Sequence, residues 1–193
     1  MKKKTAVLAA LIILLAILAN GTEAYDSGKT TAHNIITSGA VDITIVKQQL
    51  KNGSLVADTR DEIRVMPATE VSRVVKVQNN DVKSYIRARV EIAFKDAQGK
   101  KMELTDAQIS ELISLDLNTT DWLRKEGDAT WLYYKEPVDT NKSTEALFST
   151  VAFAGPAMGN EYQGSKLEIE VYAQAVQTEH NENDVLTAVG WPG

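Results

Sequence analysis

The stretch Tyr85-Ile-Arg-Ala-Arg-Val-Glu-Ile-Ala-Phe-Lys95 alternates between apolar and polar residues along its whole length. One face would carry Ile86, Ala88, Val90, Ile92 and Phe94. The opposite face would carry polar side chains, namely Tyr85, Arg87, Arg89, Glu91 and Lys95. Alternation with a period of two is typical of a β-strand that has one face in the core and one towards solvent. The sequence therefore predicts a long β-strand here.

Segments with a β-type pattern occur on both sides of this strand, at residues 41–45, 71–77, 146–154 and 167–177. Turn signals separate them, of which Asn52-Gly53 is the clearest, and Glu126-Gly127-Asp128 predicts a hairpin. Alternating strand–helix units, which a parallel α/β sheet needs, are absent. The pattern predicts a mainly β fold over residues 41–193, an antiparallel jelly-roll-like β-sandwich.

One short helix is expected between these strands, near residues 105–117. Thr105 and Gln108 have the spacing of a capping box, in which each side chain bonds to the backbone N–H of the other residue. Ile109, Leu112 and Ile113 follow at helical spacing and would share one face. We expect the helix to be an insertion between two strands of the sandwich.

The N-terminus has the three parts of a secretory signal peptide, which we place at residues 1–24. Lys2, Lys3 and Lys4 precede the apolar run 6–19, and Thr22 and Ala24 are the small residues that a signal peptidase recognises. The run has 14 residues, whereas a membrane-spanning helix needs about 20. We therefore expect a signal-peptide helix cleaved before Tyr25, no stable membrane anchor afterwards, and a secreted protein in the extracellular space or at the cell surface.

Composition limits the chemistry of the exported part. Residues 1–24 contain three Lys and one Glu, so the remaining chain has 18 basic and 25 acidic residues and a net charge of −7. Without a cluster of Lys or Arg to offset this charge, a nucleic-acid partner is not expected. The chain contains no Cys, which excludes thiol catalysis, thiolate metal sites and disulfides. An exported protein without Cys fits a Gram-positive bacterium.

Motifs of known enzymes are missing, so no catalytic residue, cofactor or metal site is predicted. His33 and His180 are far apart in the sequence, and there is neither an H-E-x-x-H motif nor a G-x-S-x-G motif. His180 has acidic neighbours that could complete a zinc site, but their spacing is not diagnostic and a plain solvated loop is the favoured explanation. These neighbours are Glu179, Glu182 and Asp184.

Aromatic residues leave a second alternative open. Trp131 and Tyr133 would share one face of a strand and could stack on a sugar ring, or could simply cover the sheet. Trp191 is expected to close one end of the sandwich.

Residues 25–40 read as an extended N-terminal arm because they are polar and lack a helical period. An arm of about 15 residues can span roughly 50 Å when extended. An open sheet edge offers unpaired N–H and C=O groups that an added strand can satisfy. The candidate residues for such an assembly contact are Ile35, Ile36, Thr37 and Val41. A disordered leader to the first strand is the alternative.

Three stretches resemble the TasA/camelysin family of exported proteins. They are the signal ending at residues 20–25, the segment Ala32-His-Asn-Ile-Ile-Thr-Ser-Gly-Ala-Val-Asp-Ile43, and the segment Glu170-Val-Tyr-Ala-Gln-Ala-Val-Gln177 followed by Gly190-Trp191. Together they cover about a third of the chain, mostly its ends. Many members have Tyr-Phe-Thr after the cleavage site, whereas Asp26 and Ser27 follow Tyr25 here.

The resemblance implies a secreted structural subunit of extracellular, biofilm-matrix-type fibres. The arm of one subunit would add as a donor strand to the next, so the partners would be other copies of this chain and related matrix proteins. A signal peptidase would act on the chain during export. Two other functions stay open: a cell-surface or polysaccharide-binding module, and a camelysin-like metalloprotease, for which the sequence supplies no ligand cluster. We expect a protein that is not an enzyme.

Overall fold

A computed structural model describes residues 34–36, 41–155 and 157–192. The predicted signal peptide 1–24, with Thr22 and Ala24, and the arm residues Tyr25 and Thr37 lie outside the described residues. The chain divides into two units, Met1–Ala32 and His33–Gly193, and the fold below is that of the second unit.

The described residues form two β-sheets and one short α-helix, which confirms the predicted mainly β class. The first sheet has the order β1-β11-β6-β9-β8, and β4 also pairs with β11. Its strands are β1 (Asn34–Ile36), β4 (Glu62–Arg64), β6 (Ser84–Lys95), β8 (Trp122–Lys125), β9 (Asp128–Tyr134) and β11 (Lys166–Gln177).

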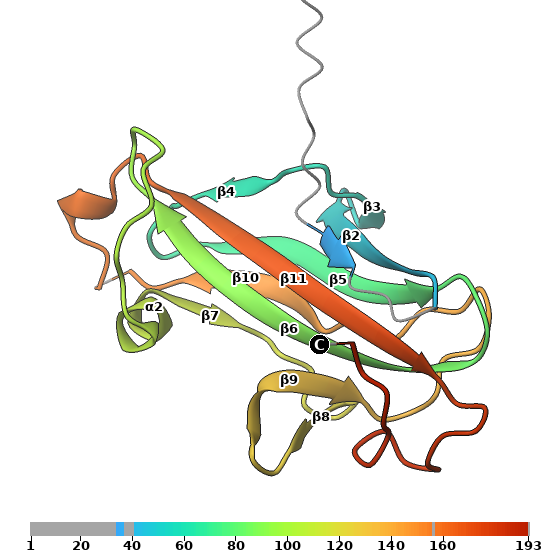
Figure 1. Ribbon diagram of the computed structural model, residues 1–193. Coiled ribbons are helices and arrows are strands. Elements are labelled where there is room, and N and C mark those ends of the chain that lie inside the picture. The colour runs from blue at the N-terminus through green and yellow to red at the C-terminus, as the bar shows by residue number, and fades with distance from the viewer. Residues whose placement is uncertain (1–33, 37–40, 156, 193) are drawn as a thin grey trace, which may run out of the picture. The chain divides into compact units, whose positions relative to one another are not determined.

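The second sheet has the order β3-β2-β5-β10-β7. Its strands are β2 (Ile43–Lys51), β3 (Ser54–Ala57), β5 (Glu70–Asn79), β7 (Ile113–Leu115) and β10 (Phe148–Phe153). The helix α2 (Asp106–Leu112) precedes β7, and the 3-10 helix η1 (Asn160–Tyr162) precedes β11. Figure 1 shows β6 and β11 side by side in front of β5 and β10.

The predicted strand 85–95 is confirmed as β6, which pairs antiparallel with β11 in an unbroken register from Lys166–Lys95 to Gln177–Ser84. The inner faces of the two sheets meet in one core, to which β6 contributes the buried Ile86, Ala88 and Phe94. All strand pairs among the described residues are antiparallel except β1 with β11, which is parallel.

The predicted helix is present but shorter than expected. The capping box of Thr105 and Gln108 is formed, and it begins α2. The helix ends at Leu112, and residues Ile113–Leu115 form β7 instead of continuing to residue 117. The backbone of Ile113 is extended and pairs with Phe153 of β10, so tertiary pairing overrides the helical spacing of this segment.

The outer face of the second sheet is poor in charge, and we call it the low-charge face. The register places 14 side chains on it, of which only Glu70 and Lys76 are charged. The other 12 are Thr44, Val46, Gln48, Leu50, Leu55, Ala57, Ser72, Val74, Gln78, Ser114, Thr150 and Ala152. The first sheet differs, because its outer face carries ion pairs such as Lys95 with Glu62 and Glu168.

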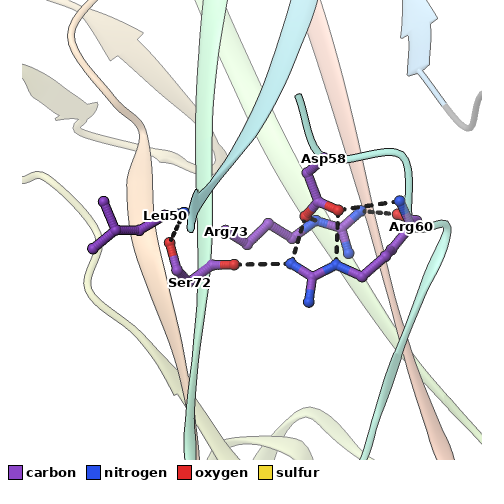
Figure 2. Close-up of polar contacts among 5 residues, drawn as sticks. All are labelled: Leu50, Asp58, Arg60, Ser72 and Arg73. Atoms are coloured by element: carbon purple, nitrogen blue, oxygen red, sulfur yellow. Dashed lines mark hydrogen bonds and ion pairs between the residues drawn. The ribbon is translucent and has the colours of Figure 1, made fainter. Parts of the chain in front are cut away.

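A buried ionic cluster joins the loop between β3 and β4 to β5 (Figure 2). Asp58 accepts hydrogen bonds from Arg60 Nε at 2.7 Å and Arg60 Nη2 at 2.8 Å. Arg73 is only 1% exposed; its Nε lies 3.9 Å from Asp58 Oδ2, and its Nη2 donates to the carbonyl of Arg60 at 2.9 Å. Nearby, Ser72 Oγ accepts from the backbone N–H of Leu50 at 2.9 Å. Asp58 is therefore the carboxylate that neutralises a buried arginine.

Candidate functional site

One edge of β6 is largely unpaired, and this edge forms one wall of the candidate site. β11 pairs with the whole length of β6 on one side. On the other side, β9 pairs only with Arg87 and Ala88. Within the described part of the chain, no strand pairs with this edge between Arg89 and Ala93. Backbone N–H and C=O groups along such an edge are ready to bond to an added strand.

The opposite wall comes from α2 and β7, the last strand of the second sheet, which pairs with β10 on one side only. Between the two walls lies a groove of about 700 Å³. Its lining is Val90, Glu91 and Ile92 of β6, Asp106, Ile109 and Ser110 of α2, and Ile113, Ser114, Leu115 and Leu117 in and after β7. We call this the β6–β7 groove.

The lining of the β6–β7 groove suits an extended, mostly apolar peptide. Six of its ten side chains are Val, Ile or Leu, and the two charged ones, Glu91 and Asp106, are both acidic. Main-chain bonding to an open strand edge together with apolar pockets for alternate side chains is the basis of recognition by β-strand addition.

The structure places part of the predicted arm on the opposite edge of the first sheet. Ile35 and Ile36 lie in β1, with their backbones in register with Tyr172 and Ala173 of β11 in the same chain. Val41 is buried in the core at 2% exposure. Of the predicted assembly residues, Ile35 and Ile36 thus lie at a sheet edge, and Val41 belongs to the folded domain.

A stack of arginine and aromatic side chains covers the outer face of the first sheet. The Arg87 guanidinium carbon lies 4.4 Å from the ring centroid of Trp131 and 4.7 Å from that of Trp191. The Arg89 guanidinium carbon lies 5.3 Å from the ring centroid of Trp131 and 4.4 Å from that of Tyr172. Each contact has the geometry of a cation–π interaction.

Hydrogen bonds hold Arg87 in this stack. Gln174 Oε1 accepts from Arg87 Nε at 2.8 Å and from Nη2 at 2.6 Å, and the Tyr133 hydroxyl accepts from Nη1 at 3.2 Å. Tyr133 donates to Asp128 Oδ2 at 2.8 Å. Burial and this hydrogen bond to Asp128 raise the pKa of Tyr133, so the hydroxyl stays protonated at neutral pH.

The contacts of this stack show where Trp131 and Trp191 lie. Trp131 and Tyr133 do share a face, but the guanidinium groups of Arg87 and Arg89 both lie over the Trp131 ring, and Tyr133 is 3% exposed. Tyr133 is therefore part of the sheet cover, and Trp131 is partly covered by the two arginines. Trp191 does not close the end of the sandwich. It packs edge-on to Tyr133, at a ring distance of 5.8 Å, on the outer face of the first sheet.

We expect Trp191→Ala to lower the free energy of unfolding by about 1–3 kcal/mol, because it removes a cation–π contact and a partly buried indole. Urea unfolding followed by circular dichroism measures the change. Val189→Ala is the control, since Val189 is in the same tail and 62% exposed, and its effect should stay within about 0.5 kcal/mol. Equal effects of the two substitutions would show that the stack does not fasten the tail.

No group of three or more His, Asp or Glu side chains that could hold a metal ion occurs among the described residues. His180 lies 3.8 Å from Glu179 with both side chains more than 80% exposed, as in a solvated loop. In the same part of the chain, no helix has the length and apolar character that crossing a membrane demands.

Sequence reasoning did not find the β6–β7 groove, because its walls come from β6 and from residues 106–117, and only the fold brings these together. Glu91 gave no signal of a groove, because the alternation of the strand already predicts a polar residue at that position. Comparisons with protein-family models, with curated proteins and with solved structures find no match for this chain.

Proposed function

We propose that this chain is a secreted structural subunit of extracellular fibres, in which the N-terminal arm of one subunit lies as an added strand in the β6–β7 groove of the next. The observation that carries the proposal is the groove itself, an apolar channel bounded by two strand edges, those of β6 and β7. The subunit domain would be a jelly-roll-like sandwich, and the protein would not be an enzyme.

The composition of the arm favours Ile35 and Ile36 as the residues that enter the groove. Between Tyr25 and Gly39 these are the only aliphatic residues larger than Ala, and the groove is lined mainly by Val, Ile and Leu. Lys29 lies upstream in the arm, and a cation there complements the acidic Glu91 and Asp106 of the groove. Thr37 would continue the added strand.

The present contact of the arm is small enough to be exchanged. β1 pairs with β11 over only three residues, Asn34–Ile36. At a net 0.5–1.5 kcal/mol for each hydrogen bond, about 1–4 kcal/mol would be given up when the arm leaves its own sheet. A longer strand in an apolar groove returns more than this, since two buried Ile side chains contribute about 3–6 kcal/mol.

The partners in this proposal are other copies of the same chain, with related matrix proteins as further members of the fibre. Before assembly, a signal peptidase would cleave between Ala24 and Tyr25 and leave the subunit without a membrane anchor. The exported subunit would then act in the extracellular space or at the cell surface.

Disulfide trapping tests the proposed junction, because the chain has no cysteine of its own. Mature protein carrying Ile35→Cys is mixed with differently tagged mature protein carrying Ser110→Cys, and the mixture is oxidised during assembly. Ser110 is exposed on α2 and lines the groove. We expect a cross-linked pair of the two tagged chains on a denaturing gel.

The matched control replaces Ser110→Cys with Thr130→Cys, an exposed position on β9 outside the groove. Cross-linking to Thr130→Cys should be at least tenfold weaker. If fibres form while Ser110→Cys is trapped no better than Thr130→Cys, the arm binds elsewhere. If mature protein forms no fibres at high concentration, the proposed function itself is wrong.

A further inference from the structure

The low-charge face is unusual for this protein. About a quarter of the whole chain is Asp, Glu, Lys or Arg, but only Glu70 and Lys76 are charged among the 14 outward side chains of the second sheet. The chain is acidic overall, so two copies repel each other over most of their surfaces. On this face Glu70 and Lys76 cancel each other, and Asp116, which follows β7 and accepts from the backbone N–H groups of Ser149 and Thr150, is a third charge at its edge. Repulsion between copies is therefore weaker here than a surface with the average charge content would give.

Apolar side chains are exposed on the same face. Leu50 and Leu55 stand directly opposite each other on β2 and β3 and are 57% and 48% exposed. Val46 lies on the same face of β2, four residues from Leu50, and stands opposite Lys76 of the central β5. The other outward side chains of β5 and β10 include the short Ser72, Val74, Thr150 and Ala152. Short side chains allow two sheets to approach to about 10 Å, the usual spacing of packed sheets.

The two charged residues are arranged so that a second copy could pair with both. Glu70 and Lys76 lie on β5, six residues and about 20 Å apart. A two-fold axis midway between them would set the β5 strands of two copies antiparallel and place Glu70 of each opposite Lys76 of the other. A two-fold contact is self-complementary in this way by its symmetry. Neither side chain forms an ion pair within the described residues.

We infer that the low-charge face is a contact between copies of this chain in neighbouring fibres, held by a two-fold pairing of Glu70 with Lys76, so that fibres associate side by side. The inference rests on the proposed fibre.

The size of the face explains why the contact would serve fibres and not single subunits. Five strands spaced about 4.8 Å apart, with about 20 Å of each central strand, give a face of roughly 400 Å². A stable pair of proteins buries about 800 Å² on each partner. Isolated subunits therefore stay single, whereas along two fibres the same weak contact repeats and its effect multiplies.

A charge exchange tests the pairing. Glu70→Lys alone puts Lys opposite Lys, and Lys76→Glu alone puts Glu opposite Glu. The double variant, Glu70→Lys with Lys76→Glu, restores opposite charges and leaves the net charge unchanged. We expect wild type and the double variant to form bundles under the electron microscope, and each single variant to form separate fibres. The bundled fraction, sedimented at low speed, should fall at least fivefold in both single variants.

The two single variants change the net charge in opposite directions, so a shared loss of bundling cannot come from net charge. If wild-type fibres stay separate, the inference is wrong, but the proposed function is unaffected. The low-charge face would then belong to a contact with a partner of another kind. Single variants that bundle like wild type, or a double variant that stays separate, also overturn the inference. Absence of fibres from every protein would remove the proposed function and the inference together.

Discussion

Deletion of residues 25–39 is expected to abolish fibre formation and to leave a folded domain. The deletion removes β1, whose pairing with β11 involves three residues, and the core is built from residues 41 onwards. We therefore expect the free energy of unfolding to fall by only about 1–4 kcal/mol. In a fibre the same arm would supply the junction, which two buried Ile side chains stabilise by about 3–6 kcal/mol.

Loss of about 3–6 kcal/mol at each junction raises the critical concentration for assembly by roughly 100-fold to 10,000-fold, because each 1.4 kcal/mol is about a factor of ten. Electron microscopy and sedimentation of the deletion protein measure assembly, and circular dichroism measures folding. The full-length mature protein with Ile35→Asp and Ile36→Asp should behave like the deletion, since it places charges in an apolar groove. If the shortened domain unfolds, β1 is an ordinary structural strand; if it assembles like wild type, the arm is not the donor.

Replacement of Asp58 with Ala is expected to lower the free energy of unfolding by about 3–5 kcal/mol, since it leaves a buried Arg73 without its carboxylate. Asp58 and Arg73 are both almost inaccessible to solvent. The one hydrogen bond from Arg73 that remains goes to the carbonyl of Arg60, and Arg73 Nη1 has no partner. Asp61 is the other carboxylate whose charge acts on Arg73, and it is exposed to solvent.

Urea unfolding of Asp58→Ala and Asp58→Asn measures this cost. Asp61→Ala serves as the control, because Asp61 is a nearby exposed carboxylate, and it should change stability by less than about 0.5 kcal/mol. A loss below about 1 kcal/mol in both Asp58 variants would show that water or another group takes over the role of the carboxylate.

The same cluster predicts how acid acts on the fold. Burial disfavours the charged form of Asp58, but the hydrogen bonds and charges of Arg60, with the charge of Arg73, outweigh it and hold the pKa below its ordinary value of 3.8. A lowered pKa in the folded state stabilises the fold above the unfolded pKa, and this contribution is lost as the pH falls through the folded value. Wild type should therefore lose stability below about pH 4, and Asp58→Asn should lose less over the same range.

Local pattern predicted the long elements of the fold well. The alternation of residues 85–95 and 167–177 depends only on one face of each strand being buried, and both became the paired β6 and β11. The capping box at Thr105 fixed the start of α2 because its bonds are local. Its end was wrong, since Ile113 is drawn into pairing with Phe153, 40 residues away.

Neither the candidate site nor the ionic cluster could be predicted from the local sequence pattern. The groove brings Val90 of β6 together with Leu117 after β7, and no spacing in the sequence signals this. Asp58 gave no sign of its partner either, because Arg73 lies on another strand and its alternation with Val71 and Val75 would have suggested an apolar residue. Short edge strands such as β3 and β4 were also missed, because three or four residues give too few repeats of the period.

The unbroken β6–β11 ladder also has a mechanical meaning. Its inter-strand bonds run perpendicular to both strands, from Lys166–Lys95 at one end to Gln177–Ser84 at the other. A pull along the strands loads all of these bonds in shear at once, whereas a pull across them opens the ladder one bond at a time. A subunit held through elements beside β6 and β11 would therefore resist stretching along these strands far better than peeling at either end of the ladder.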